Sequence, residues 1–194
     1  MAARHPVHHT RAEYIALERS AKEKHEYLDG NIYAMAGGSR EHALYAANVL
    51  TLLNVALRGR PCAAHTSDLR IRVVDTGLYT YPDVSVLCGQ PEIDPDDKQA
   101  VSNPFVLVEV TSPSTEDYDR GEKLTHYKRI PSLREVVFVS HREKLVEIVR
   151  REKDGSWSRH EARPGHAAKL ESIGCELPVD EVYRDPLAAS SAAP

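Results

Sequence analysis

Three charged side chains fall near the ends of predicted structural elements: Asp83, Glu109 and Lys123. Asp83 follows Pro82 and opens a predicted strand, and Glu109 lies near the end of the next apolar run, Phe105–Val110. If these strands are neighbours, the two carboxylates converge on one hard cation, for which oxygen ligands favour Mg²⁺ or Mn²⁺. Such an ion polarises a phosphoryl oxygen and activates a bound water. The pattern therefore indicates hydrolysis of phosphodiester bonds.

Glu109 is the residue that most needs a partner. A short β-branched run bounded by turn residues is typical of a strand buried on both faces, and an unpaired charge there is costly. The partner is either a metal ion or a basic side chain, such as Arg70 or Arg72 in a structural ion pair. We favour the metal, with the main-chain carbonyl of Val110 as a further ligand. Lys123 would then position the attacking water and stabilise the transition state.

The remaining candidates each have a structural alternative. Lys123 lies four residues after Asp119, a spacing that ordinarily gives an exposed helical ion pair. Tyr127, one helical turn further on, is expected to pack in the core with a polar tip. Glu26 is a candidate accessory residue, although a carboxylate at a strand edge is equally common. His42, near the start of a predicted helix, is another candidate, able to contact phosphate or simply to pack in the first turn.

The elements that position these residues follow from hydrophobic periodicity and turn chemistry. Predicted helices cover Arg11–Arg19, a segment capped by Ser39 that ends near Arg58, and Glu116–Ile130. Asp29-Gly30 between two alternating segments predicts an N-terminal β-hairpin. The other predicted strands are Ser67–Val74, Asp83–Leu87, Phe105–Val110, Arg134–Ser140, Leu145–Arg150 and a short strand around Trp157. This order predicts an α/β (or α+β) fold with a mixed central β-sheet flanked by helices.

Composition limits the remaining possibilities. With 194 residues, 41% of them hydrophobic, the chain is expected to form one domain over residues 1–186, followed by a disordered tail over 187–194. A net charge of -4 argues against a protein that coats nucleic acid non-specifically. Three separated cysteines without a C-x-x-C pair predict buried thiols in a reducing cytoplasm, with no zinc ribbon or disulfide framework. No leader or membrane span is expected, so we predict a cytoplasmic protein.

Together these residues resemble a known family. Pro82-Asp83, the run Val108-Glu109-Val110-Thr111-Ser112-Pro113-Ser114-Thr115, and then Asp119, Lys123 and Tyr127 are similar to a bacterial family of restriction-endonuclease-like proteins in the PD-(D/E)XK nuclease superfamily. The likeness reaches from Glu26-Tyr27-Leu28-Asp29-Gly30 and the His42 helix to Arg134-Glu135-Val136, or about residues 10 to 180. It implies a restriction-endonuclease-like sheet, a divalent metal and a homodimer.

One departure from the superfamily pattern bears on activity. The position of the expected lysine, two residues after Glu109, holds Thr111. The resemblance implies that the lysine comes from the following helix, which makes Lys123 its substitute. We therefore predict a Mg²⁺- or Mn²⁺-dependent endonuclease with DNA as substrate. The alternative is a non-catalytic member of the fold that binds nucleic acid or a protein, which the missing lysine and the acidic charge favour.

Overall fold

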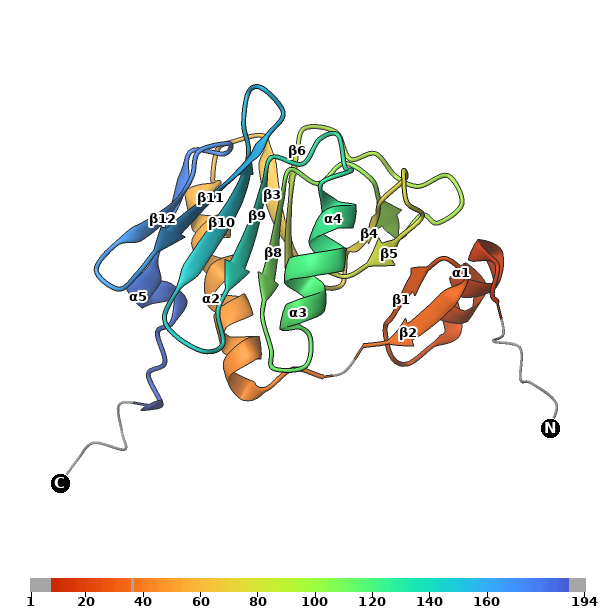
Figure 1. Cartoon of the computed structure of the whole chain (residues 1–194), viewed down its shortest axis with the longest axis horizontal. Coiled ribbons are helices and arrows are strands. Elements are labelled where there is room, and N and C mark those ends of the chain that lie inside the picture. The colour runs from red at the N-terminus through yellow and green to blue at the C-terminus, as the bar shows by residue number, and fades with distance from the viewer. Residues whose placement is uncertain (1–7, 36, 189–194) are drawn as a thin grey trace.

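A six-stranded mixed sheet forms the centre of the computed structural model, which describes residues 8–35 and 37–188. Its strands lie in the order β11-β10-β9-β8-β6-β3 (Figure 1). Their bounds are β3 Cys62–Thr66, β6 Val84–Cys88, β8 Val106–Val110, β9 Glu135–Val139, β10 Val146–Arg151 and β11 Trp157–Ala162. Strands β8 and β9 are parallel, and the other neighbours are antiparallel. The predicted fold class, a mixed sheet flanked by helices, is confirmed.

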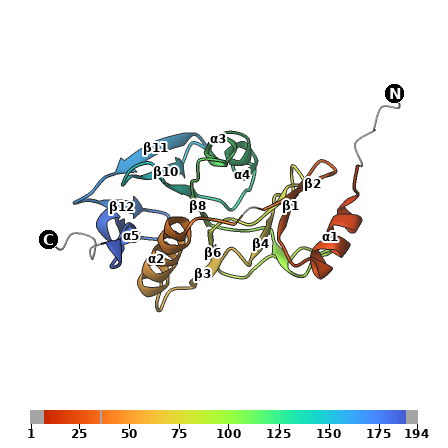
Figure 2. The same cartoon turned by 90° about the horizontal axis from the view of Figure 1, so that it is seen from below.

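Helices cover both faces of this sheet (Figure 2). The long helix α2 (Arg40–Ala56) packs on one face, and α3 (Glu116–Tyr118), a π turn (Asp119–Lys123) and α4 (Leu124–Tyr127) lie against the other. The side chains of β8 point alternately to the two faces of the sheet, as successive side chains of a strand do. Its valines join the core beneath α2, whereas Leu107 joins the core beneath α4. Glu109 therefore faces α4.

A second, five-stranded sheet carries the N-terminal hairpin. Its order is β2-β1-β5-β4-β7, with β1 His25–Leu28, β2 Asn31–Ala34, β4 Arg70–Arg72, β5 Tyr79–Thr80 and β7 Ala100–Val101. The predicted hairpin is present, and Asp29 and Gly30 both have positive φ (44° and 77°), as a tight two-residue turn requires. Helix α1 (Arg11–Ser20) packs on this sheet through Tyr14, whose ring centroid lies 5.0 Å from that of Tyr27.

The C-terminal part adds a two-stranded sheet, β12 (Ala167–Leu170) and β13 (Cys175–Pro178), followed by α5 (Val179–Val182). It closes the core beneath α2. Buried Glu135 ties the β12–β13 turn to β9 by accepting hydrogen bonds from Ser172 and from Arg150. Of the predicted tail, Leu187 and Ala188 are described, and both main-chain amides contact Asp185; residues 189–194 lie outside the described residues.

Several predicted elements differ in extent. The strand predicted over Ser67–Val74 is limited to β4, since a turn precedes it and a second turn follows. Strand β3 was not predicted, because its sequence CAAHT contains few β-branched or aromatic residues. The helix predicted over Glu116–Ile130 is interrupted by the π turn and ends at Tyr127. A π turn hydrogen-bonds over five residues and cannot be distinguished from an α-helix by periodicity over so short a segment.

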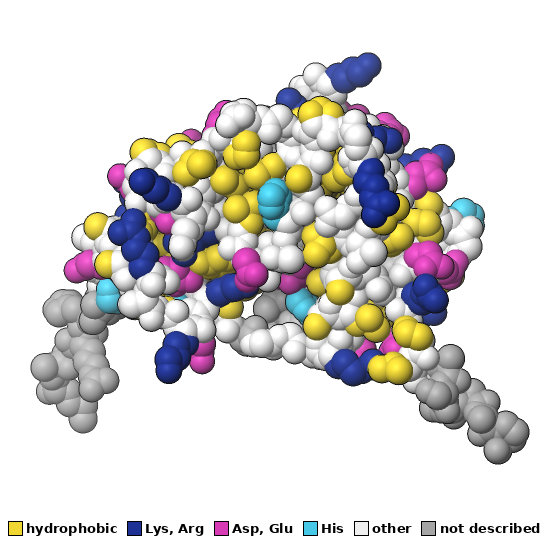
Figure 3. All heavy atoms as spheres, turned by 180° about the vertical axis from the view of Figure 1, so that it is seen from behind, with side chains coloured by type: hydrophobic (Ala, Val, Ile, Leu, Met, Phe, Trp, Pro, Cys, Tyr) yellow, Lys and Arg dark blue, Asp and Glu magenta, His cyan; other side chains and the backbone are white. Residues whose placement is uncertain are grey.

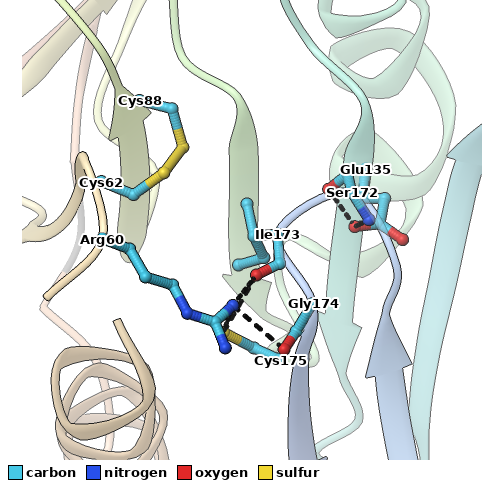
Figure 4. Close-up of a disulfide and its surroundings, with 8 residues drawn as sticks. All are labelled: Arg60, Cys62, Cys88, Glu135, Ser172, Ile173, Gly174 and Cys175. Atoms are coloured by element: carbon cyan, nitrogen blue, oxygen red, sulfur yellow. Dashed lines mark hydrogen bonds between the residues drawn. A yellow bond between two sulfur atoms is a disulfide. The ribbon is translucent and has the colours of Figure 1, made fainter. Parts of the chain in front are cut away.

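The prediction for the cysteines is wrong for two of the three. Cys62 and Cys88 are directly opposite each other on β3 and β6, with Cα atoms 4.0 Å apart, and they form a disulfide (Figure 4). The two cysteines are far apart in the sequence, and only the register of the two strands brings their side chains together. The sequence pattern therefore did not predict this pair. Cys175 is a buried free thiol, as predicted.

None of the helices within the described ranges combines the length and apolar composition needed to span a membrane. The face opposite to that of Figure 1 carries basic and acidic side chains around hydrophobic ones (Figure 3). This face therefore does not present one continuous basic surface.

Candidate active site

The ends of β6 and β8 bring the two predicted carboxylates together. Val84 of β6 is paired with Val108 of β8, so the antiparallel register places Asp83 beside the last residues of β8. Oδ2 of Asp83 accepts a hydrogen bond of 2.7 Å from the backbone amide of Val110. The predicted proximity of Asp83 to Glu109 is thus a consequence of strand pairing, and the charge on Asp83 contributes to raising the pKa of Glu109.

Lys123 lies inside the molecule. Its residue is 4% exposed, and its Nζ is 3.0 Å from Oε1 of Glu109. The same ammonium lies 3.1 Å from Oε1 of Glu26 and 3.6 Å from Oδ1 of Asp119. Both Asp119 and Lys123 belong to the π turn and both are buried. The exposed ion pair that their spacing suggested is therefore wrong, and Lys123 lies beside Glu109 as the substitute-lysine hypothesis requires.

Glu26 reaches the site from the second sheet. It lies on β1, and its carboxylate accepts hydrogen bonds from Thr80 of β5 and, at 3.4 Å, from the hydroxyl of Tyr118. Neither partner was singled out from the sequence. Thr80 belongs to a two-residue strand that has no periodic pattern, and the π turn determines the position of the helical segment that carries Tyr118.

Tyr127 closes the inner side of the site. Its hydroxyl donates a 2.5 Å hydrogen bond to Oε1 of Glu109, the same oxygen that contacts Lys123. The ring is fully buried in the core beneath α4, so the predicted core residue with a polar tip is present. Burial and the adjacent charge of Glu109 raise the pKa of Tyr127 well above its usual range. Tyr127 therefore acts as a hydrogen-bond donor to Glu109.

His42 lies at the outer side, where α2 begins. Ser39 caps the helix by accepting a hydrogen bond from the amide of His42. The Nε2 atom of His42 is 3.3 Å from Oδ2 of Asp83. The hydrogen bond to Asp83 raises the pKa of His42, burial opposes the shift, and the main chain of Val110 adds to it. His42 thus contacts Asp83, one of the predicted metal-binding groups.

The site holds more negative than positive charge. One ammonium, that of Lys123, serves the carboxylates of Glu26, Glu109 and Asp119. Burial raises the pKa of Glu109 to about 8, with Lys123 opposing this shift and Asp119 and Asp83 adding to it. Burial also raises the pKa of Asp119. A cluster with this imbalance is suited to take up a further cation.

The donor groups fit a hard divalent ion. Asp83, Glu109 and the carbonyl of Val110 offer oxygen ligands of the kind that Mg²⁺ and Mn²⁺ prefer. Among the residues that the structure describes, no three His, Cys, Asp or Glu side chains are already grouped as a metal site. The assignment of these three ligands therefore stays a prediction.

The basic partner of Glu109 is Lys123, and neither of the two arginines considered for that role pairs with Glu109. Arg70 pairs with Asp97, and Arg72 with Asp94, so both arginines have partners within the second sheet. Thr111, at the position of the expected lysine, hydrogen-bonds with Nδ1 of His141 at 2.9 Å. Sequence analysis did not select His141, because it lies in a turn with no recognisable motif.

A mixed sheet with acidic side chains at the adjoining ends of two strands, and a buried lysine beside them, defines a restriction-endonuclease-like fold. The crystal structure of a "putative nuclease belonging to DUF820" from Anabaena variabilis ATCC 29413 has the same fold, with a TM-score of 0.72. The similarity covers 88% of this chain and 95% of that one, at 16% sequence identity. The chain belongs to the Uma2 family, described as "Putative restriction endonuclease", which matches residues 11–180.

Two relatives come from Synechocystis sp. (strain ATCC 27184 / PCC 6803 / Kazusa). "Uncharacterized protein slr1290" is 41% identical over 175 residues, which cover 89% of this chain and 90% of the relative. "Uncharacterized protein sll1609" is 32% identical over 148 residues, covering 76% and 84%. The resemblance noted from the motifs is thereby confirmed at the level of family and fold.

Proposed function

We propose that this protein is a divalent-metal-dependent endonuclease that hydrolyses phosphodiester bonds in DNA. The observation that carries the proposal is the buried ammonium of Lys123, 3.0 Å from Glu109, at the strand ends where Asp83 also lies. In this proposal Lys123, supplied by the π turn, substitutes for the lysine that Thr111 replaces. Membership of a family described as restriction endonucleases supports the substrate class.

Each side chain has a role in this mechanism. Asp83, Glu109 and the carbonyl of Val110 would hold Mg²⁺ or Mn²⁺, which supplies an activated water and polarises a phosphoryl oxygen. Lys123 offers N–H donors and positive charge to the phosphate as negative charge builds in the transition state. Tyr127 and Glu26 hold Glu109 and Lys123 in place through their hydrogen bond and ion pair.

The test is cleavage of supercoiled plasmid DNA with Mg²⁺ or Mn²⁺ by the wild type and by Asp83→Asn, Glu109→Gln and Lys123→Met. We expect cleavage by the wild type and its loss in all three variants, with circular dichroism showing that each is folded. Glu176→Gln, which alters an exposed carboxylate on β13, is the matched control and should keep activity. Equal cleavage by wild type and folded Asp83→Asn and Glu109→Gln would disprove the assignment.

A non-catalytic binding protein is the second candidate. One observation favours it: Lys123 lies beside three carboxylates. The same arrangement is expected of a cluster that only stabilises the fold. Such a protein would bind DNA or a protein partner without requiring a divalent ion. Metal-independent DNA binding together with no cleavage of single-stranded, double-stranded or supercoiled DNA would favour this candidate.

We include in the proposal a homodimer and a cytoplasmic location. Sedimentation equilibrium would test the dimer. The disulfide between Cys62 and Cys88 bears on location, because disulfides are uncommon in a reducing cytoplasm. Thiol trapping in cells would therefore show whether the pair is oxidised there.

A further inference from the structure

A separate hollow lies at the end of α4 that is remote from Lys123, and it has a volume of about 560 Å³. Four parts of the chain that are distant in sequence line it, one of them contributing only Ser102. Lys128 and Ile130 follow α4, Arg151 and Trp157 come from the β10–β11 hairpin, and Val74 comes from the turn between β4 and β5. The β10–β11 turn stands beside this end of α4 (Figure 1). A volume of this size is within the range of small-molecule sites.

Arg151 gives the hollow a fixed wall. Its guanidinium donates hydrogen bonds to the carbonyls of Lys128, Ile130 and Pro131, at 2.8, 2.8 and 3.0 Å. Lys128 is the C-cap of α4, and Ile130 and Pro131 follow it, so the arginine holds the segment after the helix against β10. Arg151 also lies over the ring of Trp157, 4.9 Å from its centroid. The indole and the helix end are thereby held together.

Lys128 lines the hollow with a positive charge that no carboxylate of the described residues neutralises. Its Nζ lies 5.7 Å from the centroid of Trp157. Within residues 8–35 and 37–188 no carboxylate is paired with Lys128, and the one acidic lining residue, Asp75, pairs with Arg129 at 3.8 Å. Burial and the neighbouring charge of Arg159 lower the pKa of Lys128, so an anion bound here would stabilise its charged form.

The other walls are apolar. Ile130 is buried, and Val74 is 62% exposed. The lining also includes Pro131 and the indole of Trp157. A ligand that fits combines an anionic group with a flat or apolar portion, which describes a phosphate ester of a ring compound rather than a free inorganic anion.

We propose that this hollow binds one nucleotide unit, with its phosphate on Lys128 and its sugar or base against Val74, Pro131 and Trp157. The choice of a nucleotide among phosphate esters rests on the proposed function. The unit is therefore part of a DNA strand or a free nucleotide.

Trp157 allows a direct test, because it is the chain's only tryptophan. Its fluorescence would be followed while the full chain, kept in EDTA so that no cleavage occurs, is titrated with dAMP and, separately, with an oligothymidylate. Inorganic phosphate serves as a third titrant. The variants are Lys128→Gln and, as the matched control, Lys169→Gln on an exposed part of β12.

We expect a saturable change with dAMP or the oligonucleotide that is about tenfold weaker in affinity for Lys128→Gln and unchanged for Lys169→Gln. Saturation by dAMP identifies a free-nucleotide site, and saturation by the oligonucleotide alone identifies a contact with the DNA strand. No saturable change with either titrant overturns the proposal, as does equal affinity in Lys128→Gln or equal binding of inorganic phosphate. These titrations measure binding and not cleavage. They can therefore be interpreted even if the proposed nuclease activity is not found.

Discussion

The ammonium of Lys123 and the carboxylate of Glu109 lie 3.0 Å apart, and both side chains are buried. Lys123 comes from a π turn and Glu109 from the central strand β8. Their contact links the helical layer to the sheet at the proposed active site. The same pair therefore supports both the fold and the chemistry, and substitutions should affect the two in ways that can be separated.

Lys123→Met should destabilise the protein by about 3–5 kcal/mol, because it leaves buried carboxylates without their cation. Urea unfolding followed by circular dichroism would measure this change. The double variant Lys123→Met with Glu109→Gln should recover part of the lost stability, since one uncompensated charge is removed. A single variant as stable as the wild type would show that Lys123 is not paired in solution.

Divalent metal binding should weaken as pH falls below about 8, because the proton on Glu109 competes with the metal. The folded-state pKa of Glu109 is raised, so Glu109 is protonated in the metal-free site up to that pH and must lose its proton to act as a ligand. Calorimetric titration with Mn²⁺ across this range would measure the effect, with proton release confirmed in buffers of different ionisation enthalpy. Glu109→Gln should remove stoichiometric binding. Affinity independent of pH would contradict the assignment of Glu109.

Stability of the metal-free protein should change with pH in the opposite direction. The pKa of Glu109 is raised above its ordinary value of 4.5, so its contribution to stability is complete below that value and is lost as pH rises through about 8. We therefore expect the wild type to lose stability relative to Glu109→Gln over this interval. Thermal unfolding in EDTA at several pH values would show the difference. Parallel curves for the two proteins would place Glu109 outside the titrating cluster.

His42 should report directly on a cation at Asp83. Its pKa is raised by its hydrogen bond to Asp83, and a divalent ion bound to that carboxylate should lower it. NMR titration of the imidazole, assigned with His42→Gln, would measure the pKa with and without Mg²⁺. Asp83→Asn should also lower the pKa of His42, and Mg²⁺ should then have no further effect. A Mg²⁺-induced shift that persists in Asp83→Asn would place the ion elsewhere.

Reduction of the Cys62–Cys88 disulfide should destabilise the protein by about 3 kcal/mol, the entropic contribution expected for a loop of its length. The pair closes a loop with a sequence separation of 26 and joins the edge strand β3 to β6 (Figure 4). Urea unfolding with and without reductant would measure the change. The double variant Cys62→Ala with Cys88→Ala should not respond to reductant. Three titratable thiols in the unfolded, unreduced protein would show that the disulfide does not form.

The sequence alone was sufficient for the class of fold and for the central pair of carboxylates. The buried character of β8, the hairpin around Asp29-Gly30 and the helix capped by Ser39 are local properties, set by side-chain type and turn chemistry. The proximity of Asp83 and Glu109 also followed, because strands consecutive in an apolar pattern often pair.

The tertiary structure decided the rest, because those features depend on which distant segments meet. Burial of Lys123 required a π turn packed on β8, and Glu26 reached the site only through the pairing of β1 with β5. The disulfide depended on the register of β3 and β6, and the hollow beside Trp157 on the approach of the β10–β11 hairpin to the segment after α4. Hydrophobic periodicity reports the face that a residue occupies, whereas long-range packing determines the residue that it meets there.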